Sequence, residues 1–154
     1  MLTSGVTASL KKNSPTVSMT AGTPHWIPEM VVLAGGVNCC GDKQSGSLRL
    51  EWEDVVASQP EVIIVMPCGF NVTRALQDVP VFAQREEWAA LPAVQQQRVY
   101  VVDAKAYTSQ SGPRLVCGLE IFAEMLRPEC FSTLIPAGGA VRLSAEPRKA
   151  PRLA

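Results

Sequence analysis

Three residues of this sequence combine a reactive or charged side chain with a position next to a predicted element. Cys68 follows the apolar segment 62–66, His25 is the chain's one histidine, and Arg114 follows a Gly-Pro pair. A thiol at a strand-to-helix turn, with a histidine as its base, is the arrangement of a thiol hydrolase. A proline precedes Cys68, however, and no spacing brings His25 within bonding distance of it. We therefore keep catalysis by Cys68 as a third hypothesis and expect no enzyme activity.

Metal and cofactor chemistry finds no support in the sequence. The five cysteines form no CxxC pair and are odd in number, which fits neither a zinc site nor a closed set of disulfides. We expect them to be buried small apolar residues. No phosphate loop, dinucleotide fingerprint or zinc motif is present. The sequence therefore predicts no metal site and no covalently bound cofactor.

Two apolar runs without polar alternation, residues 62–66 and 98–102, predict strands that are buried on both faces. Helices and strands alternate along the chain, as is typical of a three-layer α/β fold in which helices flank a parallel sheet. The other predicted elements are a helix at 28–34, a loop at 37–50, a helix within 50–60, two helical pieces in 71–91 divided at Pro80 with Trp88 and Leu91 inward, a helix from Pro113 to Pro128, and a weak third strand at 16–20.

Ligands of open parallel sheets bind beyond the carboxyl ends of the strands. Segments 67–70 and 103–111 follow the two predicted strands, and segment 23–26 joins them if residues 16–20 form a strand. The combined surface is aromatic and weakly polar, which suits a large flat ligand. Other roles stay open for single residues. His25 also fits a surface or capping residue, Trp26 and Tyr107 also fit anchors of the core or of a loop, and Arg114 also fits a residue that braces its neighbours. The predicted surface comprises Trp26, Phe70 and Tyr107 with His25, Cys68 and Arg114.

Composition limits the class of protein. A chain of 154 residues with 47% hydrophobic residues can form one globular domain with a core. Lys and Arg balance Asp and Glu at 14 each, so no overall charge favours nucleic acid. No apolar run approaches the roughly 18 residues of a spanning helix, and we expect no integral membrane protein.

The two ends of the chain are expected to lie outside the fold. Residues 1–23 contain no acid and are rich in Ser and Thr, and residues 135–154 show no periodicity. We predict a disordered leader at 1–23, one lobe at 24–134 and a flexible tail at 135–154. The leader lacks the apolar stretch of a secretory signal, so the compartment stays open.

Four consecutive blocks resemble the C-terminal lobe of class III periplasmic binding proteins, in particular cobalamin-binding members of the iron-siderophore and cobalamin receptor family. The blocks are HWIPEMVVLAGG, LEWEDVVASQPEVIIVMPCGF, WAALPAVQQQRVYVVDAKAY and GPRLVCGLEIFAEMLRPECF, within about residues 24–131. The resemblance implies a receptor of an ABC-type importer, in which two α/β lobes hold a corrinoid, haem or ferric siderophore in a cleft.

The resemblance also implies roles for single residues. It assigns ligand contact to His25, Trp26, Tyr107 and the segment Cys68, Gly69 and Phe70, which agrees with the surface derived from strand polarity. Glu53 matches the position at which relatives keep a carboxylate that docks on arginines of the permease, although an acid in a first helical turn is also what the helix dipole favours.

The chain departs from the family pattern in its length. A receptor with two lobes needs an N-terminal lobe and a bridging helix, and only the predicted leader of 23 residues stands in their place here. Half of a cleft loses contact area and therefore affinity. The second hypothesis is a small α/β interaction domain that self-associates or covers its half-cleft with a partner chain.

Overall fold

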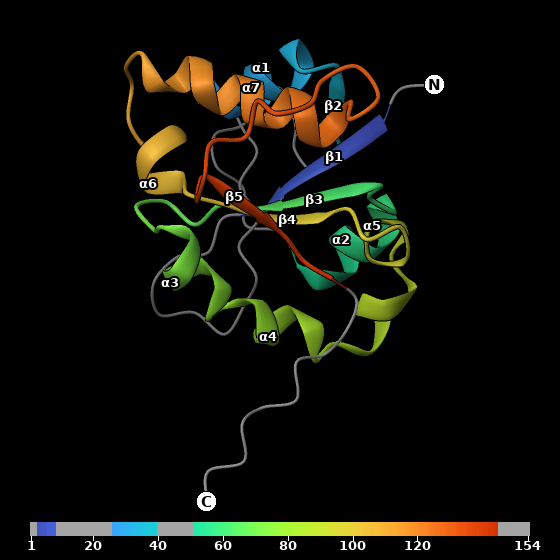
Figure 1. Cartoon of the computed structure of the whole chain (residues 1–154). Helices are drawn as coiled ribbons and strands as arrows, with labels where there is room; N and C mark the ends of the chain where they lie inside the picture. Colours follow the sequence, from blue (N-terminus) through green and yellow to red (C-terminus); the bar gives the residue numbers. More distant parts are fainter. Residues whose placement is uncertain (1–2, 9–25, 40–50, 145–154) are drawn as a thin grey trace, which may run out of the picture.

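The computed structural model describes residues 3–8, 26–39 and 51–144 of the 154, and for residues 3–8 it describes the backbone alone. Within these ranges the chain forms one sheet between two layers of helices (Figure 1). The three-layer α/β fold predicted from the sequence is confirmed. No helix in the described ranges has both the length and the apolar character needed to cross a membrane.

The sheet has five strands in the order β2-β1-β3-β4-β5. The first four run parallel, and β5 lies antiparallel to β4 at one edge. The connection from β2 to β3 passes over β1, so the direction of winding reverses between β1 and β3. The strands are β1 (Thr3–Ala8), β2 (Gly36–Asn38), β3 (Val62–Val65), β4 (Val99–Val102) and β5 (Ala140–Arg142).

The two predicted central strands are confirmed as β3 and β4. All four residues of each strand are buried, and they pair in parallel with Ile64 opposite Tyr100. Alternate side chains enter two separate cores: Ile63 and Val65 face one helical layer, and Val62 and Ile64 face the other. Burial on both faces explains why these strands read as continuous apolar runs.

The first helical layer covers the face of Ile63 and Val65 (Figure 1). Trp88 packs against this core and Leu91 is buried in it, as predicted. The segment predicted as two helical pieces forms three, and Pro80 lies in the first turn of α4, where proline is tolerated, rather than between pieces. This layer contains α2 (Trp52–Ser58), α3 (Val72–Leu76), α4 (Val79–Ala83), the 3-10 helix η1 (Glu86–Ala90) and α5 (Pro92–Gln95).

The second layer consists of α1 (Trp26–Leu33) and α7 (Arg114–Leu126), which cover the opposite face of the sheet (Figure 1). Both were predicted, α1 with a start at residue 28 rather than 26. The short helix α6 (Ala104–Tyr107) lies between β4 and α7. At Gly118 a Cβ atom would lie 2.4 Å from the carbonyl oxygen of Tyr107, so only glycine lets α7 approach α6 this closely.

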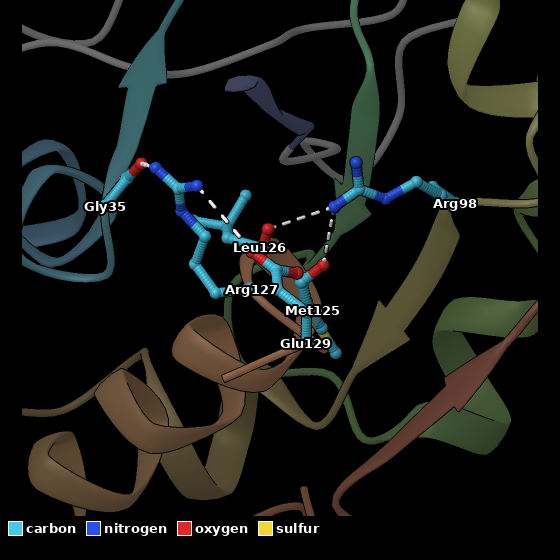
Figure 2. Close-up of polar contacts among 6 residues, drawn as sticks. All are labelled: Gly35, Arg98, Met125, Leu126, Arg127 and Glu129. Atoms are coloured by element: carbon cyan, nitrogen blue, oxygen red, sulfur yellow. Dashed lines mark hydrogen bonds and ion pairs between the residues drawn. The ribbon is translucent and has the colours of Figure 1, made fainter. Parts of the chain in front are cut away.

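Arginine side chains fix the C-terminal end of α7 (Figure 2). Arg98, directly before β4, donates from Nη2 to the carbonyl oxygens of Met125 and Leu126, both at 3.1 Å. Arg127 donates to the carbonyl oxygen of Gly35 at 3.3 Å and pairs with Glu129 at 3.7 Å. The free carbonyls at the helix end thereby gain cationic donors. This cluster lies where β4 begins, at the end of the sheet opposite to the carboxyl ends of its strands.

Several expectations about strands and boundaries were wrong. Residues 36–38, within or next to the predicted loop, form the edge strand β2. The ends of the chain also contribute to the sheet, because residues 3–8 form β1 and residues 140–142 form β5. Strands this short, or this rich in small and polar residues, carry no local pattern and depend on their partners for pairing. The weak strand predicted at 16–20 lies outside the described residues, as does the rest of the predicted leader.

Candidate ligand-binding rim

Three segments meet at the carboxyl ends of β3 and β4, on the left of Figure 1. They are the loop 67–70 after β3, the segment 103–114 that contains α6 and leads into α7, and the start of α1 at Trp26. We call these residues the carboxyl-end rim, together with Arg74, which contacts Phe70, and its ion-pair partner Asp78. His25, the remaining residue of the predicted surface, lies outside the described residues.

Trp26 connects α1 to the segment after α6. Its indole Nε1 donates to the carbonyl oxygen of Thr108 at 2.9 Å. The half-buried ring packs against the core that lies under α1 and α7. Trp26 therefore anchors the rim, which is one of the two roles that its sequence position left open.

The loop after β3 exposes a thiol and a glycine. Cys68 and Gly69 are exposed, and Gly69 has a φ of +78°, a conformation that favours glycine. The Gly69 amide donates to Ser109 Oγ at 2.8 Å, which ties this loop to the segment after α6. The amide of Lys105 donates to the carbonyl oxygen of Phe70 at 3.0 Å and adds a second tie.

Tyr107 ends α6 and is half-buried between glycines. Its carbonyl oxygen lies against Gly118, and the edge of its ring lies beside Gly139, where a Cβ atom would be 3.2 Å from Cε2. Asp103 caps the start of α6, because its Oδ1 accepts from the Ala106 amide at 2.9 Å. Trp26 and Tyr107 pack on one face of the sheet, whereas Phe70 packs on the other. The rim thus spans both faces.

Two cations of the rim, Arg74 and Lys105, were missed by the sequence reasoning, which had predicted only Arg114. The guanidinium of Arg74, in α3, lies over the Phe70 ring with Cζ 4.4 Å from the centroid, and its Nη1 donates to Asp78 Oδ1 at 2.8 Å. Lys105 is exposed on α6. The spacing of Arg74 and Asp78, four residues apart on a predicted helix, is a signal that could have identified the ion pair.

Arg114 and Glu53 are both exposed, and neither contacts the rest of the predicted site. Arg114 is the first residue of α7, and no hydrogen bond or ion pair joins it to another described rim residue. Glu53 lies in the first turn of α2, in the layer that covers one face of the sheet. Its assignment to permease docking stays a prediction.

Next to Glu53 lies a cluster of aromatic rings, in which Trp52 and Phe82 are buried, with charged side chains at its edge. Trp52 Nε1 donates to Glu87 Oε2 at 2.9 Å, and the guanidinium of Arg85 lies 5.5 Å from the Trp52 ring centroid. The hydrogen bond from Trp52, with smaller contributions from backbone hydrogen bonding and Arg85, lowers the pKa of Glu87 below its ordinary value of 4.5. Trp88 stacks between Trp52 and Phe82, with centroid distances of 6.3 and 6.2 Å.

Thiol and metal chemistry receive no support from the described residues. Cys68 and Cys130 are exposed and Cys39 and Cys117 are half-buried, so the expectation that the cysteines are buried was wrong for these positions. No side chain in the described ranges hydrogen-bonds to the Cys68 sulfur. Within the same ranges, no three His, Cys, Asp or Glu side chains converge to hold a metal ion.

Comparison with known proteins identifies the family. The periplasmic binding protein profile matches residues 7–106. An uncharacterised ABC transporter substrate-binding lipoprotein of Bacillus subtilis, YvrC, is 31% identical over 112 residues, which are 73% of this chain and 32% of the relative. The chain therefore belongs to the periplasmic binding protein family, as its resemblance implied. These are binding proteins rather than enzymes, in agreement with the prediction of no catalysis.

Solved structures share the fold. An ABC transporter substrate-binding protein from Listeria monocytogenes EGD-e superposes with a TM-score of 0.70 at 19% identity, over 83% of this chain and 48% of that one. The periplasmic vitamin B12 binding protein BtuF of Vibrio cholerae superposes with a TM-score of 0.63 at 20% identity, over 85% and 46%. The chain thus spans about half the length of these structures, and about a third of the Bacillus relative.

Proposed function

We propose that the chain is the substrate-binding component of an ABC-type importer and that its carboxyl-end rim forms one wall of a cleft for cobalamin or a related metal chelate, such as haem or a ferric siderophore. The single observation that carries the proposal is the position of Trp26, Phe70 and Tyr107 on one rim, at the carboxyl ends of β3 and β4. These rings come from three segments that are hydrogen-bonded to one another. Partly exposed aromatic side chains are suited to the flat, largely apolar body of such a ligand.

The proposal includes only one lobe. The described residues form one sheet with its two helical layers, and in the family pattern this unit supplies the C-terminal side of the cleft. Contact with one wall alone buries less of the ligand, so binding by this chain should be weak. A second lobe and a permease are the proposed partners, and exposed Glu53 is the proposed permease contact.

The test is an isothermal titration of the chain with cyanocobalamin, haemin and a ferric hydroxamate siderophore. Saturable binding of at least one chelate, weakened by Phe70→Ala, is the expected result. Phe131→Ala is the control, because it removes a partly exposed phenylalanine ring that follows α7, at the opposite end of the helix from the rim. The proposal is wrong if no chelate binds at millimolar concentration, or if both variants weaken binding equally.

A second candidate function rests on a different surface. Val32 and Leu33 at the end of α1 are 61% and 66% exposed, and Val37 on the adjoining edge strand β2 is 39% exposed. Exposed apolar residues beside a sheet edge favour pairing with another chain. This observation supports a self-associating α/β domain. A sedimentation profile of a single monomeric species across a wide concentration range would exclude it.

A further inference from the structure

Arg74 is held in one orientation on the rim, beside the aromatic residue proposed to contact the ligand. Its guanidinium is fixed from two sides, by the Phe70 ring at 4.4 Å and by Asp78 Oδ1 at 2.8 Å. The Arg74 side chain is nevertheless 44% exposed. Only one of its N–H groups has a hydrogen-bond partner among the described residues, so the others remain available. A planar, stacked guanidinium with free donors is well suited to bind a carboxylate through two hydrogen bonds.

The other charged groups of the rim add to this preference. Both carboxylates there are engaged: Asp78 pairs with Arg74, and Asp103 caps α6. Lys105 is exposed, and no ion pair neutralises it among the described residues. Its backbone amide bonds to the Phe70 carbonyl, so α6 carries this second cation next to the same loop. The rim therefore offers cations without a free competing acid in the described ranges.

A comparable arginine elsewhere shows that stacking alone does not make an anion site. Arg85 lies over the Trp52 ring at 5.5 Å, but Glu87 accepts a hydrogen bond from the same indole. Glu86 and exposed Glu53 lie on the same two elements, η1 and α2. An incoming anion would meet several carboxylates there. Arg85 is therefore a matched control for Arg74.

We propose, on the basis of the metal-chelate function above, that the rim prefers chelates that carry a free carboxylate over electrically neutral ones. Arg74 binds the carboxylate, Phe70 holds the guanidinium plane in place, and Lys105 supplies a second positive charge. The ligand class is thus an anionic metal chelate with an apolar body.

The experiment compares two probes that share the iron porphyrin and differ in whether their carboxylates are free. Haemin carries free propionate carboxylates, and in its dimethyl ester these are blocked. Titrations at low and high salt would use the intact chain and the variants Arg74→Gln, Arg74→Lys and Arg85→Gln, each checked by circular dichroism. We expect the wild-type chain to bind haemin about tenfold more tightly than the ester. Arg74→Gln should remove this difference, Arg74→Lys should restore part of it, and Arg85→Gln should leave it unchanged.

The outcomes separate this inference from the proposed function. Equal affinity for haemin and its ester, or equal effects of Arg74→Gln and Arg85→Gln, would overturn the anion preference while leaving chelate binding intact. Tighter binding of neutral cyanocobalamin than of haemin would do the same. Absence of binding to haemin, its ester, cyanocobalamin and the ferric hydroxamate siderophore would contradict both proposals. Asp78→Asn is a further check: it frees Arg74 and removes an acid, so weaker haemin binding in this variant would also count against the inference.

Discussion

At the scale of single residues, the rim is built from hydrogen bonds that orient exposed groups. Ser109 has the simplest role, because its Oγ accepts from the Gly69 amide at 2.8 Å and holds an otherwise exposed loop. A side chain that fixes a loop lowers the entropy which the loop loses on binding.

Sequence reasoning predicted Trp26, Phe70 and Tyr107 for this rim because strand polarity is a property of the fold. It missed Lys105 and Ser109, because their contacts depend on loop conformations that no local pattern encodes. It also missed Arg74, although the spacing of Arg74 and Asp78 carries a signal for their ion pair.

We predict that Ser109→Ala leaves the fold intact and frees the Gly69 amide. The lost hydrogen bond should cost about 1 kcal/mol, and hydrogen exchange at the Gly69 amide should accelerate in NMR spectra. Ser109→Thr keeps a hydroxyl and should retain most of the protection. Unchanged exchange at Gly69 in the alanine variant would show that the bond does not persist in solution.

The carboxyl of Glu87 provides a prediction about pH. The hydrogen bond from Trp52 lowers the pKa of Glu87 below 4.5. A lowered pKa in the folded state stabilises the protein above the unfolded value, and this contribution is lost as the pH falls through the folded value. Trp52→Phe removes the donor and should raise the pKa of Glu87 toward 4.5, as measured by carbon-detected NMR titration.

At the scale of elements, some helices and strands follow from their own sequence pattern, whereas others form only because a neighbouring strand pairs with them. β3 and β4 were predictable because all their residues are buried and therefore apolar. α7 was predictable because its buried residues recur at helical spacing. β2 and β5 have three residues each and lie at the sheet edges. Their place depends on the partner strand, and neither the alternation nor the length of these segments distinguishes them from loops.

The two ends of α7 give opposite predictions for removing a positive charge. Arg98 donates to the carbonyls of Met125 and Leu126 at the C-terminal end, where a cation is favourable. Arg98→Gln should therefore lower the free energy of unfolding by about 1–2 kcal/mol. Arg114 begins the same helix, at the end where a cation is unfavourable, and Arg114→Gln should be neutral or slightly stabilising. Chemical denaturation of both variants checks the pair, and equal destabilisation would contradict the role of Arg98 as a C-terminal cap.

At the scale of the whole molecule, the position of β1 determines how the two sides of the sheet are connected. β1 lies between β2 and β3, so it joins the edge strand and the α1 side of the molecule to the central strands. The lack of acids and the many Ser and Thr residues in 1–23 predict a leader, yet the segment TSGVTA within it forms an inner strand. Such a segment becomes an inner strand only through its two neighbours, and this is information that the segment itself does not contain. The family profile, which begins at residue 7, includes its last part.

The consequence is that the N-terminal residues cannot be removed as a leader could. Val6 pairs with Ile63 on β3, and Val6→Pro would take a backbone donor out of an inner strand, where proline is not tolerated. We predict a loss of about 3 kcal/mol or more of stability, with deletion of residues 1–8 having a larger effect because β2 then loses its only partner strand in the described sheet. Deletion of residues 145–154, which belong to no described element, is the control and should change the denaturation midpoint little. If the chain without residues 1–8 unfolds with the same midpoint as the intact chain, then β1 contributes nothing to stability in solution, and the lobe consists of β3, β4 and the helices around them.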